Sequence, residues 1–393
     1  MLSRGVVPLG SRCGGAELVA YQLARHLVSD GHEVTLVSDV DETFSGRMKG
    51  LEFAPVDNRL QRVSRWLPAG FVAWIIRHLA SNIAVTALAR KLIREERFEI
   101  VHAHGNLSAL LLSFFAKVPV AYTEHDAPPW CCRYRRWWER IIRTAIYRVV
   151  NVSAWRRVDR ISVTFPSLRD ELIERWGVPA DNVFAIGSGV DADVFHPVKV
   201  TREPRFRRYC LFVGGLTARK APDLLLRALA RVPEVCCVFV GDGPMRSQLE
   251  GLARQLGLGN RVAFLGSIDS GQLPPIYSEA DLVVLPSFSE TSPLVAAEAM
   301  ACGTPVLATR IAGLPALVDD FDTGLLVSPG DVGELSMAIR FLSRDPELLS
   351  SMGRQAQARA GRRWGWPVLT TQYEDVYRST ERDADAPAMA AMG

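Results

Sequence analysis

The feature that most constrains this sequence is a repeated alternation between short β-rich segments and longer stretches with helical periodicity. In the first half, five segments are typical of strands: 32–38, 98–104, 118–125, 159–165 and 182–187. In the second half, five more follow: 209–215, 235–243, 261–266, 280–287 and 304–310. Because strands that alternate with helices usually form parallel sheets of βα units, the pattern predicts an α/β fold.

The length of the chain favours two domains. Its 393 residues exceed what one hydrophobic core commonly supports. A charged segment with two prolines and no periodicity, 196–208, separates the two series of strands. We therefore predict an N-terminal domain over 1–195, a linker over 196–208 and a C-terminal domain over 209–363. The small and polar end of the chain, 381–393, predicts a disordered tail.

Composition excludes several classes of protein. A net charge of only +3 argues against a nucleic-acid-binding surface. The seven cysteines are odd in number and lack the spacing of a metal site, so we expect a reducing, cytoplasmic environment. We expect no secretory signal peptide. The most apolar window, 71–89, is interrupted by Arg77 and His78 and is a poor candidate for a transmembrane span.

The strongest chemical signal lies in the segment 286–306. Glu290 and Glu298 stand eight positions apart, the first in a loop and the second in the helix that Ser292 and Pro293 are suited to start. One carboxylate can face a donor sugar and the other can accept hydrogen bonds from a ribose. The free N–H groups of the helix start suit a diphosphate. The alternative is a pair of exposed glutamates on a surface helix.

A second signal is the segment 212–230, in which a strand and a glycine turn lead into an amphipathic helix. Lys220 lies at the junction of turn and helix, where an ammonium group can meet phosphate oxygens. Only five of the 46 basic residues are lysine, so a lysine at this place is informative. The segment lacks the Gly-Lys-Ser/Thr run of a P-loop. The alternative is an ordinary solvated lysine. We expect both Lys220 and Glu298 to be partly exposed.

Two weaker signals lie in the first half. Gly14 and Gly15 precede a helix, where glycines let backbone N–H groups approach a ligand, although an ordinary tight turn uses them equally. His102, His104 and His125 end predicted strands, which is where ligands of open α/β sheets bind. A histidine there can donate to a sugar hydroxyl or a phosphate, although a lone histidine at a strand end is more often structural.

These motifs together resemble glycosyltransferase family 4 of the GT-B fold, over most of the chain. The resemblance is densest in the segments 240–258 and 289–309, and looser in "GGAE" and "HAHG". It implies two Rossmann-like doubly wound domains facing a central cleft. It also implies a retaining, metal-independent transfer of a sugar from a nucleotide-diphosphate sugar. The segment 364–380 resembles the C-terminal helix that crosses back to the N-terminal domain in this family.

The resemblance also implies roles for individual residues. Glu290 would contact donor-sugar hydroxyls, Glu298 the ribose and Lys220 the diphosphate, while His125 would lie near the reacting sugar. Catalytic roles fall to His125, Glu290 and Lys220. The implied donor-binding residues are Gly14, Gly15, Gly215, Arg219, Lys220, Glu290, Ser292, Leu294, Val295 and Glu298.

The sequence departs from the family pattern in the same region. Where Gly215 stands, the family usually has an arginine as a second cation for the diphosphate, and Arg219 is the candidate substitute. Ala221 replaces a glycine. The departure at Gly215 keeps open a non-catalytic nucleotide-sugar-binding subunit, and the shared fold keeps open an epimerase or a phosphorylase. We expect no cofactor and no metal, because Asp191 and Asp193 lie in a turn rather than in a metal-binding motif.

The segment 133–157 bears on the acceptor. It contains eight arginines and one acidic residue with interspersed aromatic residues. Such a helix suits an anionic membrane surface, and the alternative is a helix whose aromatic residues pack inward. We expect a glycan or lipid-linked acceptor, in cell-surface polysaccharide or glycolipid synthesis, and a place in the cytoplasm or on the inner face of the membrane.

The beginning of the chain is unusual for a doubly wound domain. Upstream of Gly14, only the segment 2–7 suits a strand, whereas a first central strand commonly has about 5–6 strongly apolar residues. We expect that the natural start lies upstream. The alternative is that residues 2–7 form a short but sufficient strand.

Overall fold

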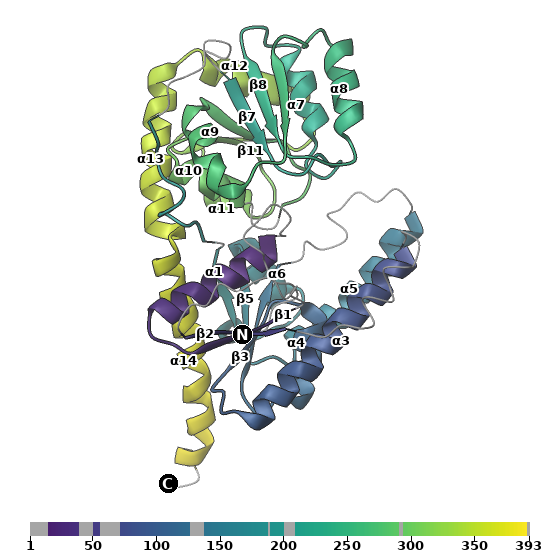
Figure 1. The fold of residues 1–393 in the computed structure, drawn as a ribbon, viewed down its shortest axis with the longest axis vertical. Helices are drawn as coiled ribbons and strands as arrows, with labels where there is room; N and C mark the ends of the chain where they lie inside the picture. The colour runs from purple at the N-terminus through teal and green to yellow at the C-terminus, as the bar shows by residue number, and fades with distance from the viewer. Residues whose placement is uncertain are drawn as a thin grey trace. The chain divides into compact units, whose positions relative to one another are not determined.

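The structure is a computed structural model of the chain (Figure 1). It describes residues 15–38, 50–55, 71–125, 137–187, 189–199, 209–290 and 294–390. Contacts divide the chain into two units. The first includes the chain up to Asp126, Trp138–Gly187 and the C-terminal segment from Leu369, and the second includes Ser188–Val368.

The second unit contains one parallel sheet of the doubly wound type. Its strands are β7 (Tyr209–Val213), β8 (Cys236–Val240), β9 (Val262–Gly266), β10 (Leu282–Leu285), β11 (Val306–Thr309) and β12 (Gly324–Val327). Their order is β12-β11-β10-β7-β8-β9, and every described pairing is parallel. The strand order reverses between β7 and β10, and ligands of open α/β sheets bind beyond the carboxyl ends of strands at such a point.

Helices cover both faces of this sheet. Alternate residues of each strand point to opposite faces, so Leu211 belongs to one hydrophobic cluster and Phe212 to the other. The first cluster contains residues of α9 (Leu273–Glu279), α10 (Leu294–Ala301), α11 (Leu314–Leu317) and the second half of α13 (Pro346–Trp364). The second contains residues of α7 (Pro222–Leu229), α8 (Arg246–Gln255) and α12 (Val332–Ser343). Both faces are therefore buried, as the apolar runs of the strands require.

The first unit also has parallel strands. In its four-stranded sheet the order is β3 (Val101–Ala103), β4 (Val120–Glu124), β5 (Arg160–Val163) and β6 (Val183–Ala185), and β1 (Val34–Ser38) pairs with β2 (Leu51–Pro55). Its helices are α1 (Gly15–Ser29), α3 (Phe71–Glu95), α4 (Asn106–Phe115), α5 (Trp137–Trp155) and α6 (Pro166–Glu174). The strands of both units confirm the α/β prediction, and β2 and β12 are strands that the sequence pattern did not indicate.

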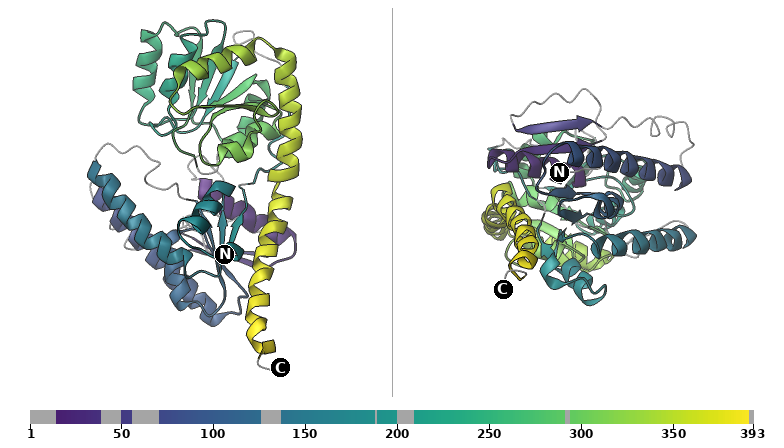
Figure 2. Two further views of the ribbon diagram at one scale, coloured as in Figure 1. Left: turned by 180° about the vertical axis from the view of Figure 1, so that it is seen from behind. Right: turned by 90° about the horizontal axis from the view of Figure 1, so that it is seen from below.

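The C-terminal helix α14 (Trp366–Ala390) packs on the first unit from Leu369 onward. Figure 2 shows it in yellow beside the strands of that unit. Arg160 on β5 fixes it, because its guanidinium donates to the hydroxyl and to the carbonyl oxygen of Ser379, each at 2.7 Å. Leu369 and Tyr373 on the same helix are both 1% exposed. The end of the chain thus contributes to the core of the first unit.

The units differ from the predicted domain bounds in two places. Residues 189–199 pack on the second unit rather than the first: Phe195 meets Tyr277 edge to face, and the backbone N–H of Val198 donates to the Ser278 hydroxyl. The helix α14 also continues to Ala390, where a disordered tail was expected from residue 381. Four of the ten residues from 381 to 390 are alanine, which is the best helix former.

No helix within the described ranges combines the length and the apolar character that crossing a bilayer requires.

The turn between β7 and α7 contains a strained residue next to Lys220. Ala221 precedes α7 with φ of 48° and ψ of 47°, a left-handed conformation that residues with a side chain adopt at a cost of about 1–2 kcal/mol. A glycine there, which the family usually has, would adopt it freely. The turn keeps its shape because the backbone N–H groups of Lys220 and Ala221 both donate to the carbonyl oxygen of Thr217.

This strain predicts a difference between two alanine-to-glycine variants. We expect Ala221→Gly to change the free energy of unfolding by no more than about 0.5 kcal/mol, because relief of strain offsets the lost methyl group and the more flexible unfolded chain. Ala228→Gly, inside α7, should cost about 1–2 kcal/mol. Urea denaturation measures both. Equal losses would show that Ala221 is not strained.

Candidate functional site

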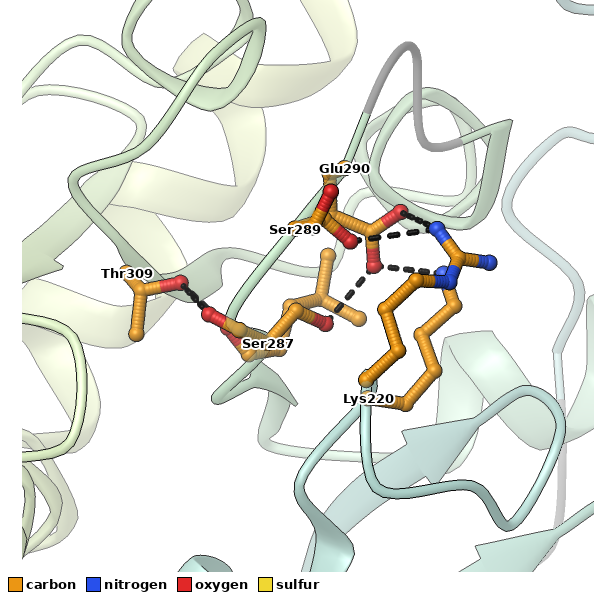
Figure 3. Close-up of polar contacts among 7 residues, drawn as sticks. Lys220, Ser287, Ser289, Glu290 and Thr309 are labelled. Carbon is orange, nitrogen blue, oxygen red and sulfur yellow. Dashed lines mark hydrogen bonds and ion pairs between the residues drawn. The ribbon is translucent and has the colours of Figure 1, made fainter. Parts of the chain in front are cut away.

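The candidate site lies at the carboxyl ends of β7 and β10, where the strand order of the six-stranded sheet reverses. Lys220 follows β7 in the turn before α7, and Glu290 follows β10 in the loop before α10. The Nζ atom of Lys220 lies 2.5 Å from Oε1 of Glu290. Figure 3 shows Lys220 and Glu290 pointing toward each other from these two loops. Lys220 and Glu290, which the two strongest sequence motifs contain, are 70 positions apart and in direct contact.

The Glu290 carboxylate is buried and multiply paired. Its side chain is 3% exposed, and its Oε1 accepts hydrogen bonds from Lys220 and, at 2.7 Å, from the Ser287 hydroxyl. The guanidinium of Arg219 lies 3.9 Å from Oε2. A buried charge is tolerated only when partners replace the lost water, and here two cations and a hydroxyl do so. The arrangement gathers two positive charges around one negative charge, which leaves a surplus suited to an anionic ligand.

Backbone hydrogen bonds hold the two loops together. The N–H of Phe288 donates to the carbonyl oxygen of Arg219 at 2.8 Å, and the Arg219 guanidinium donates to the carbonyl oxygen of Ser289 at 3.1 Å. Thr309, at the end of β11, donates its hydroxyl to the carbonyl oxygen of Ser287 at 2.7 Å. These bonds hold the loop that carries Glu290 without a ligand, and Figure 3 shows the one between Thr309 and Ser287. Preorganised polar groups of this kind are the usual source of electrostatic stabilisation in enzyme sites.

The glycines beside Lys220 have different requirements. A Cβ atom on Gly241 would lie 2.1 Å from the carbonyl oxygen of Gly214, so the turns after β7 and β8 can approach only with glycine at that position. Gly215 has no such need, because a Cβ atom there would meet its nearest neighbour, Cγ2 of Thr217, at 3.7 Å. The space at Gly215 therefore admits a side chain, and the second cation of this site is Arg219, whose side chain is 46% exposed.

Glu298 is buried in α10 and bonded inside the protein. The Tyr277 hydroxyl donates to its Oε2 at 2.7 Å, and Glu298 is only 8% exposed, so the expectation of a partly exposed side chain is wrong. Burial raises the pKa of Glu298 from 4.5 to about 7, against a smaller lowering by the Tyr277 hydrogen bond. The reason for the error is that Tyr277 lies on α9, outside the motif. The ribose contact of Glu298 stays a prediction.

This raised pKa predicts how stability depends on pH. The folded state favours protonated Glu298, so its contribution is full below about pH 4.5 and is lost as pH rises through about 7. Glu298→Gln keeps an acceptor for Tyr277 and removes the titration. We expect the variant to gain about 2–3 kcal/mol relative to the natural chain between pH 5 and pH 8, measured by urea denaturation. Exposed Glu347, changed to Gln, is the control, and a pH-independent difference for Glu298→Gln would contradict the expectation.

The histidines form a cluster at the carboxyl ends of β3 and β4 in the first unit. Nδ1 of His104 lies 2.9 Å from Nε2 of His125, and the ring of His102 lies 4.4 Å from that of His104. His102 is held at both nitrogens, by the Tyr377 hydroxyl and the Thr123 hydroxyl, each at 2.7 Å. Burial lowers the pKa of His102 and His104 well below the usual value, so both are neutral at neutral pH.

Some of the other predicted site residues lie within the described ranges, and others lie outside them. Leu294 and Val295 begin α10, next to the loop of Glu290, and Gly15 begins α1 in the first unit. Gly14 and Ser292 lie outside the described residues, as does the start of the chain. Sequence reasoning missed the hydrogen-bonding partners Ser287, Thr309 and Tyr277. A signal for the first two was their place near the ends of buried strands, because Thr309 is the last residue of β11 and Ser287 lies two residues after β10.

Within the described ranges, no group of three or more His, Cys, Asp or Glu side chains is arranged to hold a metal ion. Asp191 has a local role, because its carboxylate accepts the backbone N–H of Asp193 at 3.1 Å.

Comparison with known families follows the division of the chain. Residues 198–359 match the model described as "Glycosyl transferases group 1", and residues 13–194 match the model described as "Glycosyltransferase Family 4". The two segments follow each other and cover most of the chain. The chain belongs to the family 4 glycosyltransferases. The resemblance inferred from the motifs is thereby confirmed.

Curated relatives are similar over different lengths. The D-inositol 3-phosphate glycosyltransferase of Corynebacterium aurimucosum is 28% identical over 94% of this chain and 92% of its own. The D-inositol 3-phosphate glycosyltransferase 2 of Catenulispora acidiphila is 37% identical over 58% of this chain and 58% of its own, so this chain matches little more than half of that relative.

Solved structures confirm the GT-B fold. A sucrose-phosphate synthase from Thermosynechococcus elongatus aligns over 97% of this chain and 98% of its own, with a TM-score of 0.84 and 25% identity. Anabaena HepE in complex with UDP-glucose aligns over 96% of this chain and 99% of its own, with a TM-score of 0.72 and 21% identity.

Proposed function

We propose that this chain transfers a sugar, with retention of configuration, from a nucleoside-diphosphate sugar. The observation that carries the proposal is the cluster of Lys220, Arg219 and Glu290 at the reversal point of the second sheet. Two cations there suit a diphosphate, and a buried carboxylate beside them suits sugar hydroxyls. Because HepE of the same fold was solved with UDP-glucose, UDP-sugars are the first donors to test.

The chemistry of the cluster supports this role. Sugar transfer develops negative charge on the leaving diphosphate, and fixed cations stabilise that charge as it forms. Lys220, 15% exposed and held by Glu290, is an oriented cation of this kind. Glu290 in turn keeps one carboxylate oxygen for sugar hydroxyls beyond its bonds to Lys220 and Ser287. We propose that these residues act without a metal ion, and that Glu298 binds the ribose.

For the acceptor, we propose a class of molecules and not a single compound. A glycan or a lipid-linked glycan remains the proposed acceptor, in cell-surface polysaccharide or glycolipid synthesis. The names of the curated relatives add inositol phosphate as an acceptor to test. Incubation of one labelled donor with each acceptor class, followed by product analysis, distinguishes them. An altered nucleotide sugar without a transfer product would favour an epimerase, and a sugar 1-phosphate formed from a glycan and inorganic phosphate would favour a phosphorylase. Binding of the nucleotide without any turnover would favour a non-catalytic subunit.

Removal of the Lys220 ammonium tests the donor site. We expect Lys220→Ala to weaken donor use by about 1.5–3 kcal/mol in kcat/KM, the range for a charged hydrogen bond. Because the variant removes the cation that pairs with the buried Glu290 carboxylate, it should also lower the free energy of unfolding by about 1–3 kcal/mol. The double variant Lys220→Ala/Glu290→Gln should recover stability and leave donor use impaired. Unchanged kinetics in both variants would contradict the assignment.

Adding a positive charge at position 215 tests the donor site in the opposite direction, by an expected increase in affinity for a nucleoside diphosphate. Gly215 is exposed and a Cβ atom there would make only ordinary contacts, so we expect Gly215→Arg to tighten binding of a nucleoside diphosphate, measured by titration calorimetry. Gly215→Gln, which has similar length without the charge, is the control. Equal affinities for both variants would show that position 215 does not face the diphosphate.

Metal independence is tested directly. Since Lys220 and Arg219 are proposed to neutralise the diphosphate, we expect transfer to continue in an excess of chelator. Loss of activity that manganese or magnesium restores would show that a metal carries this charge instead.

We also propose contact with an anionic membrane surface through the segment 133–157. Within its described part, α5 exposes Ile141 and Val149, at 57% and 69%, together with Arg140 and Arg148. Its inward face packs Tyr147 and Trp155, so part of the aromatic content is structural. The mixture of exposed apolar and basic side chains is typical of helices that lie on anionic lipid.

Vesicle binding tests the membrane proposal. We expect Arg140→Gln/Arg148→Gln to reduce binding to phosphatidylserine vesicles by about 1 kcal/mol per charge, and Val149→Asp to reduce it further. Met337→Asp, at an exposed apolar residue of α12, is the control and should change nothing. If the natural chain ignores anionic vesicles at low salt, the exposed face of α5 has another purpose.

A further inference from the structure

The histidine cluster of the first unit contains a hydrogen bond whose direction can be deduced. Nδ1 of His104 and Nε2 of His125 are 2.9 Å apart, so one of them carries the shared proton. Burial keeps His104 neutral, so its ring carries a single N–H group. Two arrangements are therefore available, one with His104 as the donor and one with His125 as the donor.

The other nitrogen of His104 decides between them. Nε2 of His104 is buried and has no hydrogen-bonding partner in the described part of the chain. If His125 were the donor, neutral His104 would carry its hydrogen on Nε2, as a buried N–H group without an acceptor. Such groups are rarer in proteins than acceptors without a donor. With His104 as the donor, the unpartnered nitrogen is a bare acceptor, and His125 must accept through Nε2.

The orientation of His104 is itself fixed from behind. Its ring packs at 4.4 Å on His102, which the Tyr377 and Thr123 hydroxyls hold at both nitrogens. Tyr377 belongs to α14 and Thr123 to β4. His125, by contrast, is only partly buried at the end of β4. The more exposed histidine is thus held by a chain of buried groups.

We propose that His104 is a positioning residue for the transfer reaction, which donates to Nε2 of His125 and thereby holds His125 in the tautomer with hydrogen on Nδ1. In that tautomer, Nδ1 is the ring nitrogen through which His125 donates. The proposal rests on the proposed function and on the place near the reacting sugar that the family resemblance implies for His125. His104 itself touches neither substrate.

Histidine NMR tests the hydrogen bond without reference to activity. In the natural chain labelled with ¹⁵N-histidine, with His125 assigned through His125→Gln, we expect the shift pattern of a ring protonated at Nδ1. His104→Leu should convert His125 to a ring protonated mainly at Nε2. His104→Asn, whose amide N–H lies near the place of the histidine Nδ1, should preserve the original pattern. A natural chain with His125 protonated at Nε2 overturns the proposal.

Kinetics then tests the positioning role. We expect His104→Leu to lower kcat by about 10–100-fold with KM for the donor nearly unchanged, the usual effect of losing a group that orients a functional residue. His104→Asn should recover most of kcat. His32→Asn, at an exposed histidine of the same unit, should match the natural chain. A kcat for His104→Leu equal to that of the natural chain overturns the proposal. If the natural chain transfers no sugar from any donor, the proposed function fails, and the NMR experiment still decides the hydrogen bond.

Discussion

The candidate site depends on how the central strand β7 is hydrogen-bonded. β7 pairs with β8 on one side and with β10 on the other, although β10 follows it only after two further strands. Because all three are parallel, their carboxyl ends meet at one edge, and the loops after β7 and β10 become neighbours. The contact between Lys220 and Glu290 follows from this pairing. Neither loop could hold a buried carboxylate and its cations alone.

The close approach of loops at this edge also explains why the backbone accepts a different residue at some positions and not at others. Gly241 cannot change without separating the turns after β7 and β8, because a Cβ atom there would lie 2.1 Å from the carbonyl oxygen of Gly214. At Gly215, a Cβ atom would make only ordinary contacts, and Ala221 adopts a left-handed conformation at a tolerable cost. The departures from the family pattern thus fall at positions where the backbone can accept another residue.

Local patterns predicted the architecture and singled out residues of the candidate site, but they did not predict the contacts between those residues. The alternation of segments predicted the parallel sheets but not β12 and β2. β12 begins with glycine and β2 ends in proline, and both residue types are uncommon in strands. Lys220 and Glu290 were singled out separately, because pairing across 70 positions depends on strand order. The burial of Glu298 depends on Tyr277 from another helix. Periodicity does not predict contacts of this kind.

The return of α14 to the first unit has a consequence for synthesis on the ribosome. Residues of the second unit from Ser188 to Val368 are contiguous, so that unit has its whole sequence before the last helix emerges. The first unit begins translation earlier but completes its core only when Leu369 and Tyr373 arrive and Arg160 can bind Ser379. The surface of the first unit that α14 covers therefore stays exposed to solvent until the entire second unit has been synthesised. The half of the protein that is synthesised first is the half that finishes folding last.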